Sequence, residues 1–169
     1  MKNYGILCCI AVAVVFCLVK FLNSPKCIIN ANGTCITKIE KVKSSGGNYW
    51  EGAVKQCKGE KNLPTEQDLE NIKSYIYDGD AEPVYLSGKI SKADIKKALS
   101  HRPKVNQAHI SEFGGFNKYY TFGLYVLSSK KMGDSVYFRD FGEGGTNDGY
   151  VNPTNGKLVS RFVAMCVKH

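Results

Sequence analysis

The chain has 169 residues, of which 43% are hydrophobic and 22% charged, with seven cysteines and a formal net charge of +8. This length favours one domain with a tail and excludes large α/β barrels and two-domain dehydrogenases. The apolar fraction excludes intrinsic disorder, and the 17 glycines follow no collagen repeat.

The amino-terminal segment, residues 1–24, predicts a membrane anchor. Residues 4–19 carry no charge, and Phe21 and Leu22 extend the apolar run past Lys20. Sixteen helical residues rise roughly 24 Å, so residues 4–22 just reach across a hydrocarbon core of about 30 Å if Lys20 snorkels. A cleaved signal peptide, with Lys2 as its basic region, is the main alternative, and a buried soluble helix is another. We therefore expect residues 4–22 to contact a membrane.

Cysteine usage favours export of the remaining chain. Cys8, Cys9 and Cys17 lie in the apolar run, which leaves four cysteines outside it. An even number suits a disulfide-bonded domain in an oxidising compartment, whereas the spacing lacks the C-x-x-C pattern of common zinc sites. We expect an extracellular or periplasmic domain held at the cell membrane, or a secreted one if the segment is cleaved.

Residues 25–47 predict a disulfide hairpin and a linker. Asn32-Gly33 is a strong type I′ turn signal between two short apolar stretches. Three pairings of the four cysteines are formally possible, and the hairpin favours a bridge between Cys27 and Cys35. Cys57 and Cys166 would then close a loop of about 110 residues. Such a bridge contributes ~4–5 kcal/mol to stability in the chain-entropy model.

Two helices are predicted next. Trp50, Ala53, Val54 and Cys57 share one helical face, which ends near Gly59. Thr65 and Asp68 have the form of a capping box that opens a second helix, and its inward residues would be Leu69, Ile72 and Ile76. A third helix is expected from Ser91, and a short strand at 84–86.

After Pro103 the sequence becomes aromatic and glycine-rich, which predicts strands at 119–129, 135–141 and 158–167. Turns are expected at 131–134, 142–149 and 153–156, and residues 100–118 are expected to be a long loop. Helices early and antiparallel strands late indicate an α+β fold, which we expect to form one domain over residues 48–169.

Several motifs in this order resemble the C-type lectin-like fold. They are Trp50-x-x-Ala53-x-x-x-Cys57, Leu63-Pro64-Thr65-Glu66-x-x-Leu69, Tyr125 to Ser129, Val136 to Phe141, and Arg161 to Val167. The chain is most similar to bacterial exported domains named after the carboxy-terminal region of a collagen-like adhesin. The resemblance covers roughly residues 48–168. It implies a bridge between a cysteine on the first helix and one on the last strand, and Cys57 and Cys166 match those positions.

The chain departs from relatives of this fold that bind calcium or act as enzymes. Glu82-Pro83 is followed by Val84 where calcium-dependent lectins place an acid or amide, and Asn147-Asp148 lacks a preceding Trp. The formylglycine-generating enzymes share the fold but need a further reactive cysteine pair, which this chain lacks. We therefore expect no cofactor, with calcium a minor alternative, and no metal site.

No convergent nucleophile, base and orienting group stands out, so we expect no catalytic residues and no enzyme activity. Strand ends and Gly/Asn-rich turns that carry tyrosines instead favour a binding surface. Candidate ligand-binding residues are Tyr137, Arg139, Asp140, Glu143, Asn147, Asp148 and Tyr150.

The resulting expectation is a membrane-anchored, exported surface protein with a non-catalytic domain for ligand binding or adhesion. Its partner would be a glycan or a protein, and nucleic acid is not expected despite the basic charge. The alternative is a pilin-like structural subunit of a surface filament or secretion system. That reading is weakened because the apolar run lacks the Glu that pilins place near its start.

Overall fold

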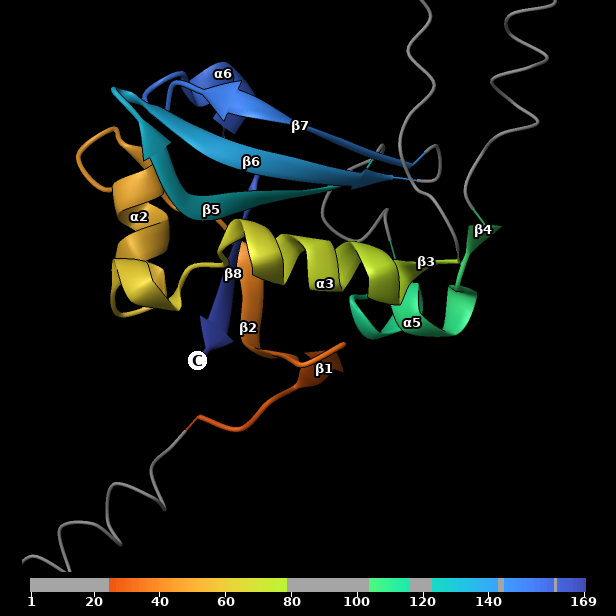
Figure 1. Ribbon diagram of the computed structural model, residues 1–169. Coiled ribbons are helices and arrows are strands. Elements are labelled where there is room, and N and C mark those ends of the chain that lie inside the picture. Colours follow the sequence, from red (N-terminus) through yellow and green to blue (C-terminus); the bar gives the residue numbers. More distant parts are fainter. Residues whose placement is uncertain (1–24, 79–103, 116–122, 143–144, 160) are drawn as a thin grey trace, which may run out of the picture.

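The computed structural model describes residues 25–78, 104–115, 123–142, 145–159 and 161–169 (Figure 1). These residues form a six-stranded mixed sheet in the order β1-β2-β8-β5-β6-β7, with a separate two-stranded pair, β3-β4. All neighbouring strands in the large sheet are antiparallel except β5 and β8, which are parallel. The expected α+β class is confirmed. The strands are β1 (Ile29–Ala31), β2 (Thr34–Lys41), β3 (Tyr77–Asp78), β4 (Lys104–Val105), β5 (Leu124–Met132), β6 (Ser135–Gly142), β7 (Gly145–Val151) and β8 (Val163–Lys168).

Helices cover both faces of the sheet. They are α2 (Tyr49–Gln56), the 3-10 helix η1 (Glu60–Asn62), α3 (Glu66–Ile76), α5 (Gln107–Glu112) and α6 (Gly156–Val159). In one core, α3 and α5 pack with Ile36, Val126 and Met165 of the sheet. In the other, α2 and Leu63 pack with Leu127, Val136 and Phe162. The sheet therefore lies between two apolar layers, as alternation of side chains along each strand requires.

The predicted hairpin is confirmed. Asn32 and Gly33 have φ values of 48° and 95°, the left-handed conformation that both central residues of a type I′ turn require. Cys27 and Cys35 form the local disulfide, eight residues apart. The hairpin belongs to the main sheet because β2 pairs along its length with β8.

The first predicted helix is confirmed as α2. The side chain of Asn48 accepts a hydrogen bond from the Glu51 backbone N–H and so caps the helix. Trp50 is buried, and its Nε1 donates to the Ser128 carbonyl oxygen at 2.9 Å. Gly52 allows a close backbone approach, since a Cβ there would lie 1.6 Å from the Lys43 carbonyl oxygen.

The second predicted helix is confirmed as α3, including its capping box. The Thr65 side chain accepts from the Asp68 backbone N–H, and Asp68 accepts from the Thr65 backbone N–H. Asp68 also accepts a hydrogen bond from Thr34 Oγ1 at 3.0 Å, which ties the hairpin to the start of α3. The expected inward residues Leu69, Ile72 and Ile76 are fully buried.

The glycine-rich part of the sequence departs from expectation in three places. The predicted turn at 142–149 is wrong, because Gly145–Val151 forms strand β7 against β6. The expected strand from 158 begins only at Val163, because Gly156–Val159 is helical. The expected loop at 100–118 contains β4 and α5 in its described part. The expected helix from Ser91 and strand at 84–86 lie outside the described residues.

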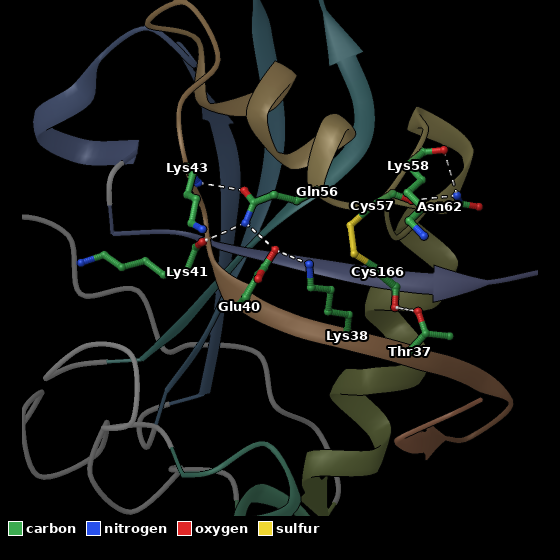
Figure 2. The surroundings of a disulfide bond; sticks show 10 residues. All are labelled: Thr37, Lys38, Glu40, Lys41, Lys43, Gln56, Cys57, Lys58, Asn62 and Cys166. Carbon is green, nitrogen blue, oxygen red and sulfur yellow. Dashed lines mark hydrogen bonds and ion pairs between the residues drawn. A yellow bond between two sulfur atoms is a disulfide. The ribbon is translucent and has the colours of Figure 1, made fainter. Parts of the chain in front are cut away.

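The second disulfide joins Cys57, which follows α2, to Cys166 of β8, 109 residues along the chain (Figure 2). Both cysteines are buried. Two further contacts hold this region, since Thr37 Oγ1 donates to the Cys166 carbonyl and Asn62 Nδ2 donates to the Cys57 carbonyl. Both expected disulfides are therefore present.

Within the described residues, no helix has the length and apolar character needed to cross a membrane. The predicted anchor at residues 1–24 lies outside them.

Candidate ligand-binding surface

The pairing of β6 with β7 decides which candidate residues can act together. Tyr137 lies opposite Tyr150, and Arg139 lies opposite Asp148. Because successive side chains point to opposite faces of a sheet, these four residues share one face. Asp140 and Asn147, which also pair with each other, lie on the other face. Glu143 is outside the described residues.

Arg139 is the centre of the first group. Its side chain is 8% exposed, and its Nη1 donates to Glu70 Oε1 of α3 at 2.5 Å. Its Nη2 lies 3.1 Å from the Tyr137 hydroxyl and 3.3 Å from Asp148 Oδ2. The two carboxylates remain about half exposed, at 45% and 44%. A buried guanidinium therefore holds two solvent-facing acceptors in fixed positions.

Tyr137 and Asp148 keep constant charge states at neutral pH. Burial and the hydrogen bond to Asp148 raise the pKa of Tyr137 to about 12, so its hydroxyl stays protonated and donates to that carboxylate. Burial alone would raise the pKa of Asp148, but hydrogen bonds from Tyr137 and Arg139 outweigh it and lower that pKa. Such groups suit hydrogen bonding to a ligand better than proton transfer.

Tyr150 and Lys130 form the outer part of this face. Tyr150 is 37% exposed, and its ring meets that of Tyr137 edge-on, with centroids 5.6 Å apart. Lys130 Nζ lies 5.5 Å from the centre of the Tyr137 ring and 2.8 Å from a carboxylate oxygen of Glu66. The β6–β7 surface, defined here as Lys130, Tyr137, Arg139, Asp148 and Tyr150, thus combines an accessible aromatic ring with fixed polar groups.

Asp140 has a different environment from the β6–β7 surface. Burial raises its pKa to about 6, although a hydrogen bond with Tyr125 opposes this shift. A Cβ on Gly123 would lie 2.3 Å from Asp140 Oδ1, so the carboxylate packs directly over that glycine. Asn147 is exposed on β7. The candidate set therefore divides, and only Tyr137, Arg139, Asp148 and Tyr150 come together.

Sequence reasoning missed Lys130, which belongs to the β6–β7 surface, and Glu70, which accepts a hydrogen bond from Arg139. Glu70 lies on α3, far along the chain from β6, and nothing in its local sequence distinguishes it from other exposed helix acids. Lys130 follows the Ser128-Ser129 motif and is brought beside Tyr137 by the pairing of β5 with β6. The contact of Glu70 depends on the packing of α3 against the sheet, and that of Lys130 on the register of β5 with β6.

Two depressions also lie outside the predicted set. A cavity of about 330 Å³ is lined in part by Trp50, Asn48 and Asn152. However, Lys131 Nζ lies 3.4 Å from the centre of the Trp50 ring and so covers that ring. A larger groove of about 780 Å³ lies beside the Cys57–Cys166 disulfide, and four lysines and a histidine are among its lining residues.

The described residues contain no group of three or more His, Cys, Asp or Glu side chains placed to hold a metal ion. Comparison of the chain with protein-family models, with curated proteins and with solved structures finds no match in any of the three.

Proposed function

We propose that this chain is an exported surface protein, anchored by residues 4–22, whose C-type lectin-like domain binds a glycan without catalysing its conversion. The observation that carries the proposal is the β6–β7 surface. It presents the exposed Tyr150 ring next to the Asp148 carboxylate on a rigid strand pair. Aromatic faces flanked by fixed hydrogen-bonding groups are suited to sugar rings, which have apolar faces and hydroxyl edges.

The remaining parts of the proposal have separate support. Two disulfides suit a chain that folds in an oxidising compartment. The bridge from Cys57, at the end of α2, to Cys166 on β8 agrees with the pairing that the lectin-like resemblance implies. The apolar run at 4–22 supports anchoring. In the β6–β7 surface, the protonated Tyr137 and ionised Asp148 support binding over acid–base chemistry.

A glycan array probed with the full chain in detergent tests the binding step. Tyr150→Ala should weaken binding to any recognised glycan about tenfold, because it removes the exposed ring. Tyr150→Phe should retain most of the binding, and Lys157→Ala, on α6 and outside the β6–β7 surface, should leave it unchanged. Adding a calcium chelator should have no effect. Absence of any bound glycan, or equal binding by Tyr150→Ala and wild type, would contradict the proposed glycan site.

A further inference from the structure

The groove beside the Cys57–Cys166 disulfide lies at one end of the sheet. It runs between β2, the carboxy-terminal end of β8 and the turn that links α2 to η1. Its volume is about 780 Å³. Figure 2 shows the disulfide, with Lys38 on β2 on one side and Lys58 and Asn62 on the other. Segments distant in the sequence therefore meet here because the disulfide joins them.

The groove has a strongly positive lining. Its ionisable side chains are Lys38, Lys58, Lys61, Lys168 and His169, and no Asp or Glu side chain is among its lining residues. Lys38 pairs with Glu40 at 2.5 Å, and His169 Nε2 lies 3.7 Å from Asp68 Oδ2. Within the part of the chain that the structure describes, Lys58, Lys61 and Lys168 form no ion pair. Three uncompensated positive charges around a concavity attract anions.

The backbone that carries Lys58 is held in a defined geometry. Lys58 has a φ of 59°, a left-handed conformation that is uncommon for a residue with a side chain. The Asn62 side chain donates to the carbonyls of Cys57 at 2.8 Å and Lys58 at 3.4 Å, which fixes this turn. The backbone position of Lys58 is thus set by the disulfide at Cys57 and by these bonds before any ligand arrives.

The groove lies close to the expected membrane anchor. Pro25 lines it, and the apolar run ends at Leu22, three residues earlier. Three residues span at most about 10 Å even when fully extended, so the connection between the apolar run and the groove wall is short. Lys26 adds a further positive charge at this junction, and Ile28 is 59% exposed beside it. A chain anchored through residues 4–22 would therefore hold this basic groove near the bilayer surface.

We propose that this groove binds the phosphate head groups of anionic lipids and seats the domain against the membrane. The inference rests on the membrane anchoring in the proposed function, but not on glycan binding. Lipid head groups satisfy both observations, since they carry the complementary charge and lie where the apolar run leaves the bilayer.

Lysine footprinting of the full chain in lipid nanodiscs tests this site. The discs contain phosphatidylcholine alone or an equimolar mixture with phosphatidylglycerol, and acetylation of each lysine is followed by mass spectrometry. Acetylation should be at least about threefold slower in the anionic discs at Lys58, Lys61 and Lys168. Lys104, whose side chain is 84% exposed, should react equally in both.

Charge-reversal variants give the matched control. Lys58→Glu/Lys61→Glu should abolish the protection of Lys168, whereas Lys104→Glu/Lys157→Glu, with the same change in net charge, should preserve it. Equal acetylation of the groove lysines in both kinds of disc would overturn the head-group site and leave anchoring intact.

Failure of the chain to enter the discs would refute the anchor. Sedimentation of the chain with vesicles of the same two compositions would then test whether the groove binds anionic head groups. Retention only on anionic vesicles, lost in Lys58→Glu/Lys61→Glu, would support the head-group site. Equal retention on both would overturn it.

Discussion

The two halves of the sheet are held together in different ways. Both disulfides involve the half formed by β1, β2 and β8, and one of them also fixes α2. The half formed by β6 and β7 has no cysteine, and Arg139 ties it to α3 through Glu70 and joins the two strands through Asp148. In the first half, covalent bonds close the β1–β2 hairpin and fasten β8 to the end of α2, whereas the second half depends on contacts that water can replace. We therefore expect the halves to respond differently to reduction, mutation and pH.

The largest effect is expected from the long-range disulfide. Cys57→Ala/Cys166→Ala should lower the free energy of unfolding by about 5 kcal/mol, because a loop of 109 residues is released in the unfolded state. Cys27→Ala/Cys35→Ala is the matched control and should cost only about 2.5 kcal/mol, since its loop spans eight residues. Urea unfolding measures both. Equal losses would show that loop length does not determine the contribution of these bridges.

A smaller effect is expected in the cysteine-free half. Arg139→Leu should lower the free energy of unfolding by about 1–2 kcal/mol, because the hydrogen bonds to Glu70, Tyr137 and Asp148 are lost while the half-exposed carboxylates regain water. Glu66 lies one turn before Glu70 on α3. Glu66→Gln removes the exposed ion pair with Lys130 and should lower the free energy of unfolding by less than about 0.5 kcal/mol. A similar loss in both variants would mean that Arg139 does not tie the helix to the sheet.

The smallest effect is a pH dependence caused by Asp140. Its pKa is about 6 in the folded protein and 3.8 for an unperturbed carboxyl, so folding favours its protonated form. The stabilisation from this group is complete below pH 3.8 and is lost as the pH rises through about 6.

Asp140→Asn should remove this dependence. At pH 4 the free energy of unfolding of the variant should match that of wild type. At pH 7.5 it should be higher by about 1 kcal/mol, after allowance for the partial exposure of the carboxyl. Urea unfolding at both pH values gives the difference and cancels the titration of other groups. A constant difference between the two pH values would contradict the raised pKa.

The sequence was most informative where local chemistry determines the backbone. Asn32-Gly33 predicted the turn, and Thr65 with Asp68 predicted the start of α3, because each acts on neighbouring residues. The strand β7 was missed because Gly145, Asn147 and Gly149 are typical of turns. Its conformation comes from pairing with β6, whose extended backbone supplies the hydrogen-bond partners.

The candidate site was predictable only in part, because it also depends on strand pairing and not on local sequence alone. Tyr137, Arg139, Asp148 and Tyr150 could be named from the sequence, but their separation from Asp140 depends on which face each side chain occupies. The lysines of the groove are spread from position 38 to position 168. They converge only after β2 pairs with β8 and Cys57 meets Cys166.

The position of β8 has a consequence for how the chain acquires its structure. This strand, Val163–Lys168, lies in the middle of the sheet, between β2 and β5, although it is the last element described. During synthesis, β2 and β5 therefore lack their shared neighbour until β8 has emerged, and only then can the centre of the sheet close. The Cys57–Cys166 disulfide likewise can form only after β8 has been synthesised, so the centre of the sheet and its long-range bridge are completed together.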